Sequence, residues 1–503
     1  MQTKTSKHQR PQLKKPKNAI NPQDMNRKMT LFFISFFAIN SLILLIFCMA
    51  TQGNSLSWIL FSGGKTQDQF MDFLNSIRDS AQRDVYNGRG SIYPPLSVLY
   101  FRFIALFIDN DIVGLSFRNR RTIWSDQRSM LMVVFFISSS MLIINKMISK
   151  KFTNKTNRLF AEILSAQLIF SYPMLYAIER GNIIILTMMT SMFFFFYRNS
   201  ENKVLKELSY IMLAVSAGLK YYPAVFGLIL IREKKFKDAL RLMLYGISAI
   251  AIPLVLIKYF DTKAIESAAA LANVQTGSVG VLPAKIGTGS QGSFVSSMIK
   301  NLVRFFNKKS SGFNASSVSI YNFAYFFKNT NKAFANTMST FLLWTSEILA
   351  LISFFIVKKE WERVFLLCYL IINIPAASSV YSLIFLIIPL VMFILEPNKK
   401  KSDWFFLILF AFLLTPIPTW LYAWDAQIRV ASVFYDFHYD RSLNKLCGSS
   451  FTQAMFFGLV IRAIVTLLSS DKKSPSEPSQ SIEEAVEVAE SVEEGAQAQE
   501  FAV

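Results

Sequence analysis

The chain is dominated by long apolar runs that are nearly free of charged residues. Several contain roughly 16 to 22 residues, and about 20 apolar residues in a helix cross the ~30 Å hydrocarbon core of a bilayer. Of the 503 residues, 52% are hydrophobic and only 17% are charged, whereas soluble proteins carry about 25% charged residues. We therefore predict an all-α polytopic membrane protein, a bundle of about 12 transmembrane helices. This composition excludes a soluble enzyme, a secreted disulfide-bonded scaffold and a DNA-binding protein.

The positive charges indicate how the apolar runs thread through the membrane. Thirteen segments can be recognised, near residues 29–50, 92–109, 129–147, 159–177, 182–197, 208–220, 222–231, 238–260, 338–357, 364–376, 379–395, 403–423 and 451–469. Lys and Arg gather in short clusters between them, and such clusters stay on the cytoplasmic side. One threading places these clusters and both termini inside. It requires an even number of crossings, so one segment must re-enter, either 159–177, which contains Pro173, or 92–109. An irregular segment persists at membrane depth only where protein or a cavity surrounds it, which indicates an outward-facing site.

The two ends of the chain differ from the region between them. Residues 1–28 hold eight Lys or Arg and one acid, and residues 471–503 hold nine acids and two Lys. We expect a disordered basic tail and a disordered acidic tail, both cytoplasmic. Residues 29–470 then form one transmembrane domain, with external loops at 51–91 and 261–337. The net charge of +20 follows from this topology and predicts no nucleic-acid partner. Three Cys and two His predict neither a disulfide framework nor a metal site.

The first external loop, residues 51–91, concentrates acidic residues. They are Asp68, Asp72, Asp79 and Asp84. Apolar residues recur at helical spacing between Phe70 and Ile77, which indicates an amphipathic helix lying on the membrane, with the first three acids on about one face. A carboxylate held there can take a proton from a hydroxyl. The alternative is a solvated helix whose acids only face water.

Three short motifs follow one another on the predicted outer face. They are Asp72-Phe73 with Tyr86 and Tyr93-Pro94-Pro95-Leu96, then Arg180-Gly181-Asn182, then Gly218-Leu219-Lys220-Tyr221-Tyr222-Pro223. In this order they resemble the polyprenol-phosphate-mannose-dependent mannosyltransferases of glycosyltransferase family 87, which are multi-spanning C-type glycosyltransferases. A fourth element, Ser378-Ser379-Val380-Tyr381, is similar to a place where relatives often have a His–Tyr pair, although this chain has no His there. Each motif alone also suits a helix start at the membrane interface.

The resemblance implies sugar transfer, with mannose as the expected sugar, from a polyprenyl-phosphate donor to a glycolipid or glycan acceptor. It implies Asp72 as the general base, with Asp68, Asp79 and Asp84 as other acidic candidates. Cations should meet the charge that develops on the leaving phosphate, and Arg180, Lys220 and, less directly, Arg89 are candidates. Contacts to sugar or phosphate are expected from Tyr93, Tyr221, Tyr222 and Tyr381. The alternatives are cations that snorkel to the headgroups and tyrosines of an aromatic belt.

The same resemblance implies no nucleotide, no metal and no other cofactor. We expect the protein to be a monomer in the plasma membrane, in contact with membrane lipids and with its active site external. The Gly-rich stretch 277–293 lacks a G-K-[ST] motif and is expected to be a mobile external loop, with a lid over the lipid substrates as its candidate role. Arg102 and Glu347 lie inside apolar runs and are candidates for a role at membrane depth or for simple pairing. The last outer loop offers three acids that either bind acceptor or are solvated: Asp425, Asp436 and Asp440.

Two other functions fit a protein with this many spans. A lipid-linked oligosaccharide flippase or transporter is expected to show two related halves or charges deep in several helices. No repeat between the halves is visible, and few deep charges occur. A cell-surface polysaccharide polymerase would share the external site and differ in the length of its product.

Overall fold

The computed structural model describes residues 22–53, 69–82, 85–86, 93–116, 121–153, 158–274, 332–375, 380–416 and 443–471, with the single positions 296, 299 and 303. These residues are helical or form turns, and no β-strand occurs among them. The elements are α1 (Pro22–Ala50), α3 (Met71–Ser80), α4 (Pro95–Ala105), α5 (Asn110–Ser116), α6 (Arg121–Ser125), α7 (Gln127–Thr153), α8 (Arg158–Ile169), α9 (Tyr172–Arg180), α10 (Ile184–Tyr197), α11 (Lys203–Leu219), η2 (Tyr222–Gly227), α12 (Leu228–Arg232), α13 (Phe236–Val274), α16 (Lys332–Ile356), α17 (Glu360–Asn373), η4 (Val380–Leu386), α18 (Ile387–Leu395), α19 (Asp403–Leu414) and α21 (Leu443–Asp471). The all-α class is confirmed for this part of the chain.

Four of the described helices are long and apolar enough to cross a membrane, namely α1, α7, α13 and α21. Helices α8 and α9 pass the same test together but meet at a bend of 54°, so they form a broken span or a re-entrant loop. This pair covers the segment 159–177 that we expected to be irregular. Pro173 occupies the first turn of α9, where a missing N–H is tolerated. Other apolar helices have only 10–17 residues, and the count of about 12 transmembrane helices stays a prediction.

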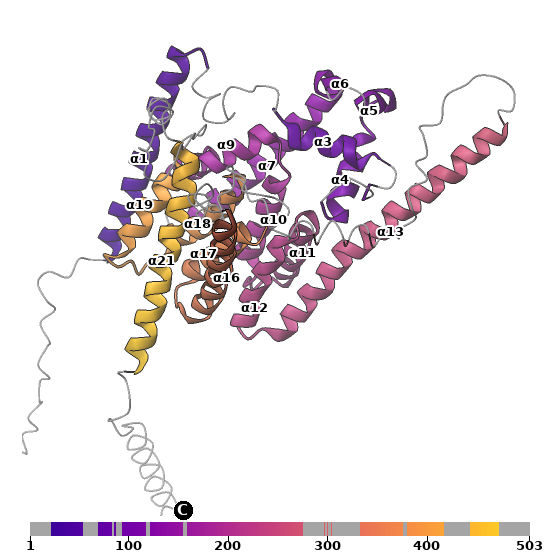
Figure 1. Cartoon of the computed structure of the whole chain (residues 1–503). Helices are drawn as coiled ribbons and strands as arrows, with labels where there is room; N and C mark the ends of the chain where they lie inside the picture. Colours follow the sequence, from indigo (N-terminus) through magenta and orange to yellow (C-terminus); the bar gives the residue numbers. More distant parts are fainter. Residues whose placement is uncertain are drawn as a thin grey trace, which may run out of the picture.

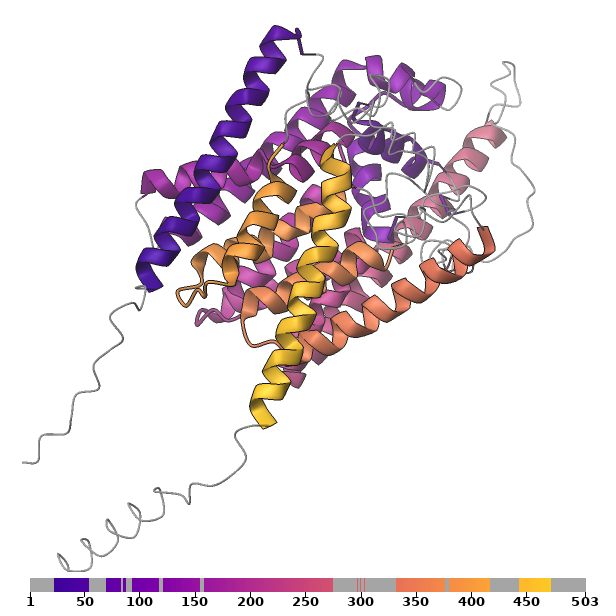
Figure 2. The same cartoon turned by 60° about the vertical axis from the view of Figure 1, so that its left-hand side comes forward.

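Three of the long helices lie at the edges of the bundle, and several short apolar helices lie between them. Helices α1 and α21 lie on one side and α13 on the opposite side, with α10, α11, α17 and α18 between them (Figures 1 and 2). Large apolar side chains are exposed along the long helices, such as Leu42 of α1 and Val255 of α13. Almost every residue of α17 is buried. Extended apolar faces are unfavourable in water and suit lipid chains, so the pattern is that of a membrane protein.

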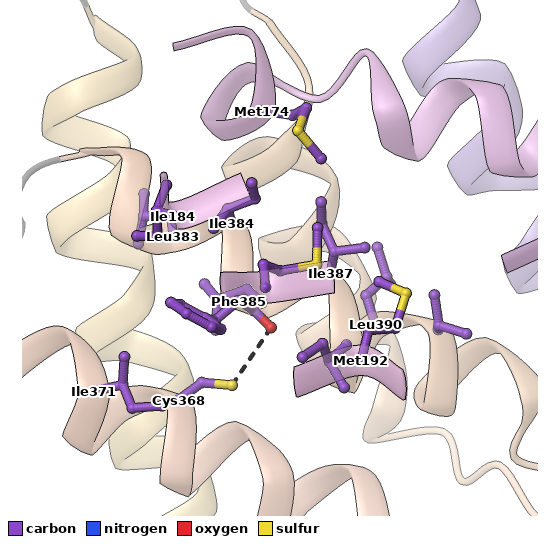
Figure 3. Close-up of a cluster of buried hydrophobic side chains, with 14 of the residues drawn as sticks. Met174, Ile184, Met192, Cys368, Ile371, Leu383, Ile384, Phe385, Ile387 and Leu390 are labelled. Carbon is purple, nitrogen blue, oxygen red and sulfur yellow. Dashed lines mark hydrogen bonds between the residues drawn. The ribbon is translucent and has the colours of Figure 1, made fainter. Parts of the chain in front are cut away.

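The interior packs η4 and α18 against α9, α10 and α17. Figure 3 shows Phe385 of η4 among Met174, Met192 and Leu390, all buried. The thiol of Cys368 donates a weak hydrogen bond to the Phe385 carbonyl oxygen at 3.4 Å. This packing fixes η4 beside α9, two elements that are about 200 residues apart in the sequence.

Charged residues from the predicted basic clusters meet at one end of the bundle. The Arg198 side chain is 1% exposed and pairs with Glu233, at 2.9 Å, and with Glu360. Nearby, Lys359, from the basic cluster between segments 338–357 and 364–376, pairs with Asp403 at 2.8 Å, and Arg462 of α21 pairs with the same carboxylate at 2.6 Å. The start of α1 and the end of α21 lie at this end too, away from α3 and α9 (Figures 1 and 2). The clusters expected to share one side of the membrane therefore share one end of the molecule.

Two predicted boundaries and one predicted environment differ in the structure. The end of the predicted basic tail is helical, because α1 begins at Pro22. Met25, in the first turn of α1, is buried. The predicted external loop 261–337 is helical at both ends, since α13 continues to Val274 and α16 begins at Lys332. The predicted membrane-surface helix is α3, and its apolar face contacts protein. Its residue Phe73 packs on the rings of Phe101 and Phe136, with centroids 5.4 and 5.1 Å away. Residues 1–21 and 472–503 lie outside the described residues.

Candidate functional site

The site begins where the start of α3 meets the end of α9. The Phe70 N–H donates to the Glu179 carbonyl oxygen at 2.7 Å. Helix α9 ends at Gly181, which has a φ of +59°, a left-handed conformation that glycine adopts without steric cost. A Cβ on Gly181 would lie 2.8 Å from the Phe73 Cβ. The absence of a side chain at Gly181 therefore lets α3 approach α9 closely.

This approach places Asp72 beside the Arg180-Gly181-Asn182 turn. The Arg180 guanidinium donates to Asp72 Oδ1 at 2.6 Å, and the Asn182 amide donates to Asp72 Oδ2 at 2.7 Å. The Asn182 Oδ1 accepts the Ile184 N–H at 2.9 Å, and the residue is only 1% exposed. The side chains of Asp72 and Arg180 keep 16% and 19% exposure. Both carboxylate oxygens thus have partners, and the charge pair keeps some access from outside.

Lys220 brings a second cation to this end of the bundle. It follows α11 in extended conformation, and the preceding carbonyl, that of Leu219, accepts a hydrogen bond from Ser97 Oγ at 2.6 Å. The ammonium lies over the Tyr93 ring, 4.7 Å from its centroid, and 5.7 Å from that of Tyr381, at cation–π distance. Burial lowers the pKa of Lys220 to about 8, and the charge of Asp72 opposes this shift.

Tyrosines surround these charges. Tyr381 of η4 stacks on Tyr176 of α9, with centroids 6.3 Å apart. Tyr93 accepts, at its carbonyl oxygen, a hydrogen bond from the Tyr86 hydroxyl at 3.2 Å. Burial and the nearby charge of Asp72 raise the pKa of Tyr93 well above its ordinary value, and burial raises the pKa of Tyr221 to about 12. The phenols therefore stay neutral at physiological pH and can serve as hydrogen-bond partners or ring surfaces.

Tyr222 has a different position from its neighbour Tyr221. Its ring packs edge-on against Phe385, with centroids 5.9 Å apart, and the residue is buried. Its place is thus between the site and the apolar interior. We infer that Tyr222 supports the turn that carries Lys220.

The structure brings together five of the predicted site residues, each from a different segment: Asp72, Tyr93, Arg180, Lys220 and Tyr381. Asp79 pairs with its neighbour Arg78 at 2.6 Å, and its side chain is 40% exposed. Arg102 pairs with Asp261 at 2.9 Å and donates to the carbonyl oxygens of Ser80, the last residue of α3, and of Gln82, which is the simple pairing considered above. Glu347 lies within α16. The other candidates lie outside the described residues: Asp68, Asp84, Arg89, Asp425, Asp436, Asp440 and the Gly-rich stretch 277–293.

Two residues at the site had no predicted role. Asn182 belongs to the quoted turn, and the signal for it was an amide next to an arginine and a glycine. Tyr176 stands four residues before Arg180, one helical turn away, but an aromatic residue in an apolar segment gave no distinguishing signal. Within the residues that the structure describes, no group of three or more His, Cys, Asp or Glu could hold a metal ion.

Comparison with known proteins bears on the whole arrangement. The family model described as glycosyltransferase family 87 matches residues 92–299, a stretch that contains Tyr93, Arg180 and Lys220. No curated protein and no solved structure matched the chain. The match confirms the family that the motifs indicated, and the geometry joins the matched region to Asp72 and Tyr381 beyond it. Residues 92–299 of this membrane protein are thus similar to the glycosyltransferases of family 87.

Proposed function

We propose that the protein moves a sugar, mannose, from a polyprenyl-phosphate donor to a hydroxyl of a glycolipid or glycan acceptor. The observation that carries this proposal is the contact of the Asp72 carboxylate with Arg180, with Lys220 held close by between two tyrosine rings. One anion and two cations from separate segments are what a base and a phosphate site require.

In the proposed step, the acceptor O–H proton passes to the Asp72 carboxylate. The acceptor oxygen forms a bond to the anomeric carbon of the sugar, and the bond from that carbon to the phosphate oxygen breaks. The electron pair leaves on the polyprenyl phosphate, whose added charge is met by Arg180 and Lys220. An Arg can hold two phosphate oxygens at once, whereas a Lys acts as a point charge. No nucleotide, metal or other cofactor takes part in this proposal.

We propose the outer face of the plasma membrane as the place of the reaction. The end of the bundle that holds the basic clusters also holds the start of α1 and the end of α21 (Figure 1). Because Lys and Arg favour the cytoplasmic side, we assign that end and both termini to the cytoplasm and the opposite end, with Asp72, to the outside. The proposal takes the protein as a monomer that contacts membrane lipids.

The test is transfer by the purified full-length protein in detergent, with labelled polyprenyl-phosphate mannose as donor and a membrane lipid extract as acceptor. Wild type is compared with Asp72→Asn and with the control Asp109→Asn, whose carboxylate forms an exposed ion pair with Arg128. We expect transfer by wild type and the control, and loss of at least about 100-fold in Asp72→Asn, with donor binding retained.

Other outcomes would contradict parts of the proposal. Transfer that survives in Asp72→Asn assigns the base to another acid. Transfer only from another polyprenyl-phosphate sugar refutes mannose and keeps the donor class. Long products would indicate a polymerase. No transfer from any such donor by wild type refutes the enzyme, and movement of a lipid-linked oligosaccharide across vesicle membranes would then support the flippase.

A further inference from the structure

Asp72 is held by two partners that differ in how firmly they are fixed. The bond from Asn182 comes from a residue that is 1% exposed, and the bond from Arg180 comes from a side chain that is 19% exposed. The bonds also go to different carboxylate oxygens, Oδ2 and Oδ1. The two oxygens are therefore not equivalent.

The Asn182 side chain cannot turn away from Asp72 without losing its hydrogen bond to the backbone. Its Oδ1 accepts the Ile184 N–H at 2.9 Å, a local turn that an Asn side chain makes with the backbone two residues later. An N–H can only donate and a carboxylate can only accept, so these two partners fix the amide with its Nδ2 toward Asp72. The turn at the start of α10 thus orients the donor.

Arg180, in contrast, can change partners. It has five N–H donors and no acceptor, and a phosphate competes with a carboxylate for the same bidentate pair of hydrogen bonds. When a donor phosphate takes the guanidinium, Asp72 Oδ1 loses its partner while Oδ2 remains bound to Asn182.

We propose that Asn182 is the positioning residue of the base: it holds Asp72 Oδ2 and thereby directs Oδ1 to accept the acceptor proton. This inference rests on the proposed function and assigns within it the oxygen that reacts. An Asp side chain otherwise rotates, and a misplacement of about 1 Å at a reacting group can cost 100-fold in rate.

Two substitutions separate this role from that of a turn residue. Asn182→Asp keeps an oxygen for the Ile184 N–H and nearly the same shape, but replaces the donor that faces Asp72 by an acceptor. Asn182→Ser also keeps an oxygen for that turn, adds no charge and is too short to reach Asp72. The matched control is Asn202→Asp, because Asn202 caps α11 through bonds to the Val204 and Leu205 N–H groups at the other end of the molecule.

The charged and titratable groups near Asp72 come from four other elements. They are Arg180 at the end of α9, Tyr93 before α4, Lys220 after α11 and Tyr381 in η4. None of them is changed in the three variants. In Asn182→Asp a second carboxylate faces the first, and of two such neighbours one binds a proton more readily. The acid limb of the pH–rate profile should therefore move.

The experiment uses the same purified protein, donor and lipid extract at pH 5 to 9, with donor binding and thermal melting measured for each variant. We expect Asn182→Ser to lower kcat by about 10- to 100-fold with donor affinity within about threefold of wild type. We expect Asn182→Asp to lower kcat and move the acid limb up by about one pH unit or more. Asn202→Asp should match wild type.

Rates in both Asn182 variants that fall only with the fraction of folded protein, or an acid limb that stays in place in Asn182→Asp, would overturn the inference. If Asn182→Asp does not fold, Asn182→Ser decides through the split between kcat and donor affinity. The proposed function is judged separately from wild type and Asp72→Asn. A wild type that transfers no sugar overturns both.

Discussion

Replacing Gly181 by alanine should separate the base from its cation without touching either. Gly181 has a φ of +59°, and an added Cβ would lie 2.8 Å from the Phe73 Cβ and 3.4 Å from the Phe70 Cα. Ordinary contacts begin near 3.4 Å, so α3 has to move away from α9 by about 0.6 Å, a difference of those two distances. A left-handed residue other than glycine costs about 1–2 kcal/mol in addition.

The displacement acts on Asp72 because it adjoins Phe73 in the first turn of α3. Its hydrogen bonds to Arg180 and Asn182, at 2.6 and 2.7 Å, would lengthen beyond a good geometry. We expect kcat to fall by about 10- to 100-fold and the free energy of unfolding to fall by about 2 kcal/mol.

The assay is transfer kinetics with donor and acceptor varied in turn, beside thermal melting in detergent. The control is Gly114→Ala in α5, because nothing lies within 4 Å of its added Cβ and alanine favours a helix. Wild-type kcat in a stable Gly181→Ala protein would refute the reasoning, since Asp72 would then not depend on this close approach. An equal loss in Gly114→Ala would refute it as well.

Three further predictions follow from the structure. Because burial lowers the pKa of Lys220 to about 8, its ammonium is present below that pH, and donor affinity should fall about tenfold per pH unit above pH 8. The variant Lys220→Arg stays charged and should remove this fall. A pH profile of donor affinity that is the same in Lys220→Arg as in wild type would refute the phosphate role. Arg102→Ala should lower the free energy of unfolding by about 2 kcal/mol, because the carboxylate of Asp261 and two carbonyl oxygens lose their donor. Thermal melting measures this loss, and a melting temperature equal to that of wild type would contradict the prediction. In a background without native cysteines, Asp79→Cys, which lies in α3 with Asp72 and is 40% exposed, should react with an impermeant thiol reagent on intact cells. Lys234→Cys, at the opposite end, should react only after permeabilisation, and the reverse pattern would invert the proposed topology.

Part of the site could be predicted from the sequence because its signals lie in neighbouring residues. The turn at Gly181 ends α9 through a residue with positive φ, and a glycine followed by a polar residue and a long apolar run is a recognisable pattern. Lys220 was recognisable as a cation between two apolar segments. The role of each as a neighbour of Asp72 depended on contacts between segments about 110 and 150 residues apart, which no local pattern records.

Helical periodicity could not choose among the acids of the first loop. Asp72 and Asp79 are seven residues apart, which puts them on nearly the same face but about 10 Å apart along the axis. The packing of Phe73 against Gly181 decided which turn of α3 meets α9. It left Asp79 to its neighbour Arg78 and turned the apolar face toward protein.

The class of the protein could be predicted from composition, since runs of about 20 uncharged residues match the thickness of a bilayer. The resemblance to the family was visible too, since each of its motifs is a short run of neighbouring residues. The pairing of Asp72 with Arg180 and Asn182, and the burial of Lys220 between Tyr93 and Tyr381, were visible only once the helices were packed together. Span length and turn chemistry are properties of neighbouring residues. Charge pairing and burial depend on the packing of distant helices, in which small overlaps at one glycine fix the position of a carboxylate.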